Sequence, residues 1–461
     1  MRVWSARDGF DMIRGVTIMP EYIQSEGVEE ILDRVQAAGL NAVATSPYIM
    51  IPSERMDGDE TQHGEFHREP PVDAGSGKVR LLERPLFGKR ELWFTIAPSF
   101  RPNDELYEGL RYRPPVSEHV IDPFLNDFIA RASGRGIDVY LQIQAAIPPS
   151  LRVQFGGPVE EDKAMLPDGA SLKNPLSKNA SLASGEVLNY TRALTEDLLQ
   201  QYPGIHGVRF DWPEYPCYHL DALFTDFNPQ AAALSVHFEE ARSVAARFYR
   251  KLHELTDQDL DAPNFCDVAD ESLDVWRTMK RDLVTRYNRS LCEVVRGHGK
   301  RAILHAFPPP FSDLTGFDFA ANAEHADGVG MKLYTMHLPM ILRNYGQQLL
   351  AWNPELSEER LVVALNRWLD LADEPLASLD AYAYPRPEQP HPVSDAAQAR
   401  KIAAASAAGE RVHIMTHTYG PVEDFARRLR VASAHCSGGF WINRYAYLDD
   451  NKYVELQTSC T

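Results

Sequence analysis

A short stretch that joins a predicted strand to carboxylates and aromatics is the first candidate for chemistry. Residues 205–210 carry the β-branched and aromatic side chains typical of a strand, and Asp211-Trp212-Pro213-Glu214-Tyr215-Pro216 follows at once. The two prolines fix the backbone, so neither strand nor helix continues there. Two carboxylates on a rigid turn can act as nucleophile or base and as general acid. The structural alternative is that Asp211 caps the turn and Glu214 is solvated.

The elements around this turn alternate between strand and helix patterns. Strands are predicted over 12–19, 41–45, 137–143, 205–210, 301–307, 328–336, 411–416 and 438–445. Helices are predicted over 27–38, 116–135, 185–201, 230–255, 271–298, 338–350, 357–371, 396–408 and 422–434. This count predicts the α/β class and a (β/α)₈ TIM barrel. We expect one barrel domain over residues 1–461, with residues 47–116 as a substrate-side insertion after the second strand and extended loops at the C-terminal face.

In such a barrel the C-terminal strand ends meet at one mouth, where ligands bind. The predicted ligand-binding residues are Glu21, Tyr22, Gln142, Gln144, Arg209, His305, Lys332, Tyr334, His417 and Trp441. Aromatic rings can stack on the C–H faces of sugars, while amides and carboxylates bind hydroxyl groups. No phosphate-binding glycine loop is present. We therefore expect a small-molecule carbohydrate or glycoside as the partner. For the two glutamines, a polar core layer with satisfied hydrogen bonds is the alternative.

Two strands resemble those of a known family. Gly207-Val208-Arg209-Phe210-Asp211 resembles the fourth-strand signature of the α-amylase-type glycoside hydrolases, Gly-apolar-Arg-x-Asp. Gly136-Ile137-Asp138-Val139-Tyr140-Leu141 is similar to the third-strand pattern of the same proteins. The resemblance implies that Asp211 is the nucleophile. It also implies that Arg209 is the cation that keeps Asp211 ionised, since an adjacent positive charge lowers the pKa of a carboxyl group.

The sequence departs from that family at the other catalytic positions. The family carries an acidic Glu on the fifth strand and an Asp on the seventh, where this chain has His305 and His417. Gln142 stands where a carboxylate is usual. The general acid must come from elsewhere, and the available carboxyl groups are those of Glu214, Glu21, Asp267 and Glu324. We predict a divergent glycoside hydrolase-like enzyme with Asp211 and Glu214 as its catalytic residues. A retaining enzyme holds its two carboxyl groups about 5 Å apart and an inverting enzyme roughly 6.5 to 9.5 Å apart.

Other functions are compatible with the same barrel. Lys332 falls on the sixth strand, where class I aldolases carry their Schiff-base lysine, so a lyase or aldolase is one alternative. The structural alternative pairs Lys332 with Asp211 or Glu324. A non-catalytic sugar-binding barrel is another alternative, since a hydrolase that has lost its catalytic activity would also lack acid residues.

A metal-dependent sugar isomerase is the third alternative. His63 and His67 have a spacing that would align two imidazoles on a helix, although their segment does not read as helical. His305, His337 and His417 could also approach one another at the mouth. The structural alternative is that these histidines are hydrogen-bonded and bind no metal.

Charge and cysteine content narrow the class of partner. The formal net charge of −18, without a basic run, argues against nucleic acid or an anionic membrane. Five scattered cysteines without a CxxC pair indicate neither a zinc ribbon nor a disulfide framework, and they favour a reducing compartment. The first residues lack the apolar core of a secretory signal, and no stretch approaches the roughly 18 apolar residues of a spanning helix. We expect a cytoplasmic enzyme without cofactor or metal. The sequence does not determine the oligomeric state, and a homo-oligomer is compatible with it.

Overall fold

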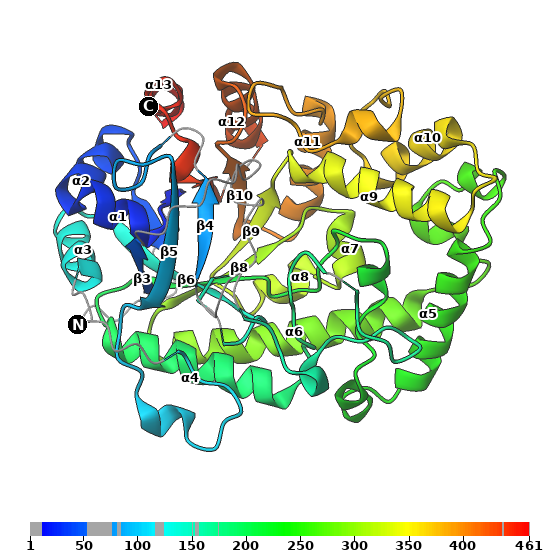
Figure 1. Ribbon diagram of the computed structural model, residues 1–461, viewed down its shortest axis with the longest axis horizontal. Helices are drawn as coiled ribbons and strands as arrows, with labels where there is room; N and C mark the ends of the chain where they lie inside the picture. Colours follow the sequence, from blue (N-terminus) through cyan, green and yellow to red (C-terminus); the bar gives the residue numbers. More distant parts are fainter. Residues whose placement is uncertain are drawn as a thin grey trace.

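The structure is a computed structural model that describes residues 12–52, 76–80, 84–115, 124–149, 151–152, 156–173, 175–435 and 438–460. Its centre is a closed barrel of parallel strands in the order β1-β11-β10-β9-β8-β7-β6-β2 (Figure 1). The barrel strands are β1 (Ile13–Thr17), β2 (Ala42–Thr45), β6 (Asp138–Gln144), β7 (Gly207–Asp211), β8 (Arg301–Ala306), β9 (Gly328–Leu333), β10 (Val412–His417) and β11 (Gly439–Asn443). The predicted (β/α)₈ TIM barrel is confirmed.

Helices follow the strands around the outside of the barrel. They are α1 (Pro20–Glu26), α2 (Val28–Ala37), α3 (Phe124–Gly134), α4 (Gly185–Gln201), α5 (Phe238–Leu252), α6 (Asp274–Gly297), α7 (Phe311–Thr315), α8 (Phe319–Ala323), α9 (His337–Trp352), α10 (Glu358–Leu369), α11 (Asp395–Ser406), α12 (Val422–His435) and α13 (Asp450–Cys460). Short 3₁₀ helices cover Asp104–Tyr107, Glu160–Asp162, Asp221–Phe224, Pro229–Ala233, Asp259–Asp261, Phe265–Val268, Leu379–Tyr382 and Tyr445–Tyr447. In the described part of the chain, no helix has the length and apolar character needed to cross a bilayer.

One predicted helix is interrupted. The helix expected over 230–255 is a 3₁₀ turn over Pro229–Ala233 followed by α5, which begins at Phe238. Ser235 and Val236 lie in the gap, and Val236 is 96% exposed. Ser and β-branched residues are weak helix formers, and an exposed segment gains no tertiary packing that would offset this.

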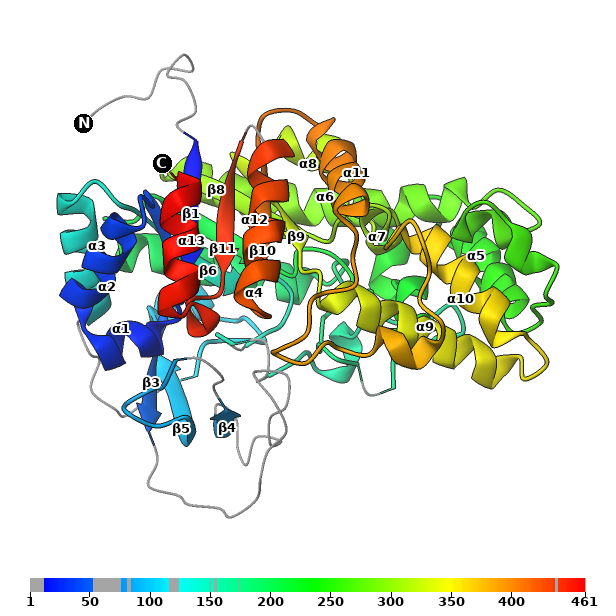
Figure 2. The same ribbon diagram turned by 90° about the horizontal axis from the view of Figure 1, so that it is seen from above.

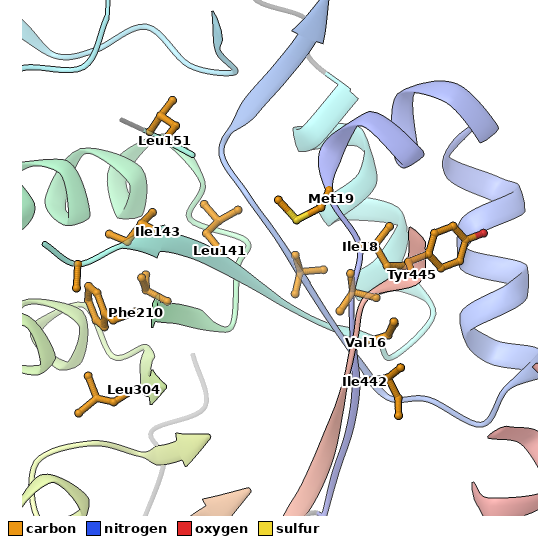
Figure 3. Close-up of a cluster of buried hydrophobic side chains, with 14 of the residues drawn as sticks. Val16, Ile18, Met19, Leu141, Ile143, Leu151, Phe210, Leu304, Ile442 and Tyr445 are labelled. Atoms are coloured by element: carbon orange, nitrogen blue, oxygen red, sulfur yellow. The ribbon is translucent and has the colours of Figure 1, made fainter. Parts of the chain in front are cut away.

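Alternation along the strands separates the outer core from the barrel interior. On β6, Leu141 and Ile143 belong to the hydrophobic core between the strands and the outer helices, as does Phe210 on β7 (Figure 3). Successive side chains point to opposite faces of a strand, so Gln142, Gln144, Arg209 and Asp211 face the interior. Burial of each large apolar side chain contributes about 1.5–3 kcal/mol. The outer core therefore fixes which residues face inward.

A bulky indole fills the barrel interior below the mouth. Trp441 on β11 is fully buried and packs edge-on against Tyr140, with ring centroids 5.6 Å apart. The Arg209 guanidinium lies 4.0 Å from the centre of the Trp441 ring. Gly15 on β1 leaves room for the indole, because a Cβ there would lie 2.2 Å from Trp441 Cε3. The interior at this level is a packed core.

A small antiparallel sheet forms within residues 47–116. It consists of β3 (Tyr48–Pro52), β4 (Ser76–Arg80) and β5 (Glu91–Pro98) in the order β3-β5-β4. Figure 2 shows this sheet beyond the barrel end at which α1 follows β1, which is the C-terminal end of the strands. Arg84 ties this region to the barrel, since it pairs with Glu26 at 2.8 Å and donates to the Leu448 carbonyl at 2.9 Å.

A second hydrophobic core lies beside the barrel, where α5, α9 and α10 extend away from it (Figure 1). Trp276 of α6 stacks on Phe224 at a centroid distance of 5.3 Å in this core. The same core continues to Trp212 and Phe307, which line the end of the barrel. The helical extension therefore supports the residues that follow β7 and β8.

Candidate functional site

Asp211 ends β7 and receives contacts from three other barrel strands. Its Oδ1 lies 2.9 Å from Lys332 Nζ on β9 and 3.7 Å from His305 Nδ1 on β8. The backbone N–H of Trp212 also donates to Oδ1, at 3.1 Å. Gln142 Nε2 on β6 donates to Oδ2 at 3.4 Å. The strand order β6-β7-β8-β9 thus brings an amide, a carboxylate, an imidazole and an ammonium group together.

The surroundings of Asp211 keep it ionised. Burial alone would raise its pKa, but Lys332 and His305 outweigh this effect and lower the pKa of Asp211 below its ordinary value. The Asp211 side chain is 19% exposed, whereas that of Lys332 is 4% exposed. The carboxylate side chain is therefore partly exposed, while its counterion stays covered.

Arg209 lies one layer deeper and contacts His305. Its Nε donates to His305 Nε2 at 2.8 Å, and its Nη1 donates to Thr17 Oγ1 at 3.2 Å. Burial and the Arg209 charge lower the pKa of His305 to about 3. The cation next to Asp211 is Lys332, because Arg209 stands two residues earlier on the same face of β7, one side-chain layer below.

Lys332 is held between Asp211 and two aromatic rings. Its Nζ lies 4.9 Å from the ring centre of Trp212 and 5.0 Å from that of Phe307. Cation–π contacts of this length are favourable when the site is shielded from water. Lys332 pairs with Asp211, as the structural alternative for this lysine predicts.

Glu214 is fully buried behind the turn, so the solvated Glu214 of the structural alternative is wrong. The Phe307 N–H donates to its Oε1 at 2.6 Å, and Thr315 Oγ1 lies 2.5 Å from its Oε2. Burial raises the pKa of Glu214 to about 7, although Lys332 and the two hydrogen bonds counteract part of this effect. Glu214 therefore links the turn after β7 to the loop after β8 and to α7.

Gln142 and Gln144 extend inward from β6, with Gln144 in register with Asp211. The two residues are 8% and 9% exposed. The Oε1 atom of each is buried without a hydrogen-bond partner among the described residues. Each amide therefore has an acceptor oxygen that no described protein group occupies.

Aromatic and histidine rings line the side of the barrel formed by β9 and β10. Tyr334 contacts the rings of His417 and His337 at centroid distances of 5.3 and 5.6 Å. His417 Nδ1 accepts from the Tyr419 N–H at 3.0 Å. Burial and the charge of nearby His337 hold the pKa of His417 well below its usual range. His337 and His417 thus flank Tyr334, whereas the contacts of His305 are with Arg209 and Asp211.

Within the described ranges, no group of three or more His, Cys, Asp or Glu side chains is arranged to hold a metal ion. His63 and His67 lie outside the described residues.

Glu21 and Tyr22 belong to a neighbouring set of contacts where α1 meets the small sheet. Glu21 accepts from Tyr48 Oη at 2.8 Å and from Arg152 Nη1 at 3.2 Å, and all three side chains are buried. The Tyr22 ring packs edge-on against Tyr445 at 5.6 Å. The structure therefore joins Gln142, His305 and Lys332 directly to Asp211, while Glu21 and Tyr22 have other partners and Trp441 lies beneath the site.

Several residues of the site were not singled out from the sequence. Trp212 and Phe307 flank Lys332, and each stands directly after a barrel strand, which is a usable signal. Thr315 and Arg152 come from loops and a short helix, and no sequence pattern marks them.

No protein-family model matches this sequence, and no curated protein sequence matches it either. Solved structures match its fold. A β-galactosidase from the psychrophilic Marinomonas ef1 aligns with a TM-score of 0.53 and 14% identity over 97% of this chain and 59% of that one. A β-galactosidase from Bacillus circulans sp. alkalophilus aligns at 0.47 and 10% identity, over 98% of this chain and 55% of that one. The catalytic domain of a β-amylase from Paenibacillus polymyxa aligns at 0.47 and 8% identity, over 97% and 98%. The chain thus spans less than two thirds of either β-galactosidase. The first match shows that the barrel fold is shared.

Proposed function

We propose that this chain is a glycoside hydrolase-like enzyme that acts on a carbohydrate or glycoside, with Asp211 as its nucleophile or general base. The observation that carries the proposal is the ionised Asp211 carboxylate at the C-terminal end of β7, paired with Lys332 and partly exposed at the mouth. Catalytic residues of (β/α)₈ enzymes come from these strand ends. The fold shared with a β-galactosidase is compatible with this chemistry, although a shared fold alone does not specify a reaction.

The groups around Asp211 suit a neutral, hydroxyl-rich ligand. The amides of Gln142 and Gln144 offer hydrogen-bonding groups, and the partly exposed ring of Tyr334 offers an aromatic surface, while the rings of Trp212 and Phe307 lie buried around Lys332. The charge of Lys332 is matched by Asp211, so we do not assign Lys332 to bind an anionic substituent. This composition supports a sugar as the ligand class.

Glu214 is our candidate for the general acid, and its hydrogen bonds support a neutral carboxyl group. The single hydroxyl proton of Thr315 faces two acceptors, Glu214 Oε2 at 2.5 Å and the Ser312 carbonyl at 3.0 Å. A proton on Glu214 resolves this competition, since Glu214 would donate to Thr315 and Thr315 to Ser312. A pKa of about 7 agrees with that state, which is the one a general acid needs.

The experiment is an assay of wild type, Asp211→Asn and Glu214→Gln against a panel of p-nitrophenyl and methyl glycosides. Asp211→Asn should abolish hydrolysis of every substrate that the wild type cleaves. Full activity in this variant would rule out the assignment. Glu214→Gln should lose about 10²–10⁴-fold on methyl glycosides and far less on p-nitrophenyl glycosides, whose leaving group needs little protonation. Equal activity of wild type and Glu214→Gln on both substrate types would show that Glu214 is structural.

Separate measurements distinguish two of the alternative functions. A Schiff-base lyase would be trapped by borohydride on Lys332 in the presence of its carbonyl substrate. A non-catalytic sugar-binding barrel would bind glycosides in calorimetry without cleaving them. The observed ion pair of Lys332 with Asp211 favours the hydrolase over the lyase, because it gives Lys332 a role in holding the carboxylate.

We further propose that the enzyme works in the cytoplasm without a cofactor and without nucleic-acid partners. Its net charge of −18 and its scattered cysteines support this assignment.

A further inference from the structure

The two oxygens of Asp211 have unequal surroundings. Oδ1 faces Lys332 Nζ at 2.9 Å, the Trp212 N–H at 3.1 Å and His305 Nδ1 at 3.7 Å. Within the described ranges, Oδ2 accepts one hydrogen bond, the long one from Gln142 Nε2 at 3.4 Å. Lys332 and the Trp212 N–H thus hold Oδ1, and His305 Nδ1 lies near it beyond hydrogen-bonding distance, whereas Oδ2 accepts a single long hydrogen bond.

The Arg209 contact determines which nitrogen of His305 carries its proton. A guanidinium group has only donors, so His305 Nε2, 2.8 Å from Arg209 Nε, must be the acceptor and has no proton. In a neutral imidazole the proton is then on Nδ1, the nitrogen that faces Asp211 Oδ1. The charged groups next to this imidazole are Arg209 and Asp211 on β7 and Lys332 on β9, and Gly330 on β9 packs against its ring. None of them competes with Arg209 for Nε2.

We infer that Arg209 is a positioning residue that fixes His305 as the Nδ1–H tautomer, so that this N–H faces Asp211 Oδ1, the oxygen held by Lys332 and the Trp212 N–H, and Oδ2 is left as the oxygen that meets the substrate. The inference rests on the proposed function for its catalytic meaning. The tautomer itself is a property of the free protein.

In this arrangement the protein anchors Oδ1 of the Asp211 carboxylate, and Oδ2 is available to react. A proton on Nε2 instead would set two donors against each other at the Arg209 contact and would turn a bare nitrogen toward the Asp211 carboxylate. Both contacts would be repulsive, and the lone pair of Nδ1 would face the carboxylate oxygen that Lys332 and the Trp212 N–H hold. Oδ2 meets Gln142 in the observed orientation, so the same amide that contacts Oδ2 can also contact a bound sugar.

The test is a long-range ¹H–¹⁵N correlation spectrum of wild-type protein labelled with ¹⁵N-histidine, recorded without substrate. The signal of His305 among the fifteen histidines is assigned from its absence in His305→Gln or His305→Asn, whichever variant folds. We expect a neutral Nδ1–H pattern that persists from about pH 8 to about pH 5, where an ordinary histidine titrates. An Nε2–H pattern, or a doubly protonated ring near pH 6, would overturn the inference.

Substitution of Arg209 tests the cause of the tautomer. Arg209→Met should release Nε2, so that His305 shows both tautomers and titrates closer to an ordinary histidine, whereas Arg209→Lys keeps a donor and should keep the Nδ1–H form. An unchanged tautomer in folded Arg209→Met would remove Arg209 from the inference. If Arg209→Met does not fold, the wild-type spectrum tests the Nδ1–H tautomer, and Arg209→Lys tests whether a donor at position 209 maintains it. Glycoside assays of Asp211→Asn test the proposed function alone, and the histidine spectra test the tautomer alone. Failure of the proposed function can therefore be told apart from failure of this inference.

Discussion

Lys332 Nζ and Asp211 Oδ1 lie 2.9 Å apart, although their strands β9 and β7 are separated in the barrel by β8. The ion pair spans the end of β8 above His305, which contacts the same oxygen at 3.7 Å. Three adjacent strands are therefore coupled through one carboxylate. The charge state of Asp211 depends on a lysine 121 positions away in the sequence (332 minus 211).

Lys332→Met should make Asp211 harder to ionise. Lys332 lowers the pKa of Asp211, so its removal lets burial raise that pKa. The acid limb of kcat/KM should then move to higher pH. The pH–rate profile of a cleaved p-nitrophenyl glycoside measures this shift. Lys163→Met, at an exposed position paired with Glu160, is the control and should leave the limb in place. Identical acid limbs in Lys332→Met and wild type would contradict the role given to the ion pair.

Glu214→Gln should change how stability depends on pH. The pKa of Glu214 is raised from 4.5 to about 7 in the folded protein, so the folded state binds more protons than the unfolded state between these values. The free energy of unfolding contributed by Glu214 therefore falls as pH rises from about 4.5 to about 7. Glu214→Gln removes this loss. Between about pH 5 and pH 8, its free energy of unfolding should therefore rise relative to that of the wild type by on the order of 1–3 kcal/mol. Urea unfolding at both pH values measures it.

The control for that experiment is Glu239→Gln, whose side chain is largely exposed and pairs with Arg242. Its unfolding free energy should follow that of the wild type at both pH values. A Glu214→Gln curve parallel to the wild type would mean that Glu214 titrates normally.

Arg209→Met should destabilise the fold far more than loss of a surface arginine. The change leaves His305 Nε2 and Thr17 Oγ1 without their donor and removes the cation over the Trp441 ring. We expect a loss of roughly 3–5 kcal/mol in the free energy of unfolding. Arg242→Met, which breaks an exposed pair with Glu239, should cost less than about 1 kcal/mol. Similar midpoints for the two variants in a denaturant titration would show that the Arg209 contacts contribute little.

Gly15→Ala should disturb the barrel interior. A Cβ at this position would lie 2.2 Å from Trp441 Cε3, so the indole or the β1 backbone must move. Overpacking of this kind costs about 1–3 kcal/mol or more. Gly134→Ala, at the end of α3 with open space around the new Cβ, is the matched control and should be neutral or slightly stabilising. Thermal unfolding of both variants compares them, and an equal Tm would show that the Trp441 packing is adaptable.

The barrel could be predicted from the sequence because its signals are local. Most barrel strands carry several β-branched, aromatic or other apolar residues, and the alternation of Leu141, Gln142, Ile143 and Gln144 on β6 already separates core from interior. The position of Asp211 at the end of a strand could be predicted because Pro213 and Pro216 follow it and prevent the strand from continuing. The interruption before α5 was missed, since it depends on packing that Val236 does not make.

The contacts within the site could not be predicted, because they depend on which strands are neighbours and on loop packing. The resemblance of residues 207–211 suggested Arg209 as the partner of Asp211, but an arginine two residues earlier reaches His305 in the layer below. The burial of Glu214 depends on Phe307 and Thr315, which come from loops and helices far along the chain. Whether Asp211 and Glu214 act as nucleophile and acid stays a prediction.

The indole of Trp441, packed against Tyr140 and Arg209, fills the barrel interior beneath Asp211. Approach to this carboxylate along the barrel axis from the N-terminal ends of the strands is therefore blocked at that level. Under the proposed function, substrate and product would both have to pass the C-terminal ends of the strands.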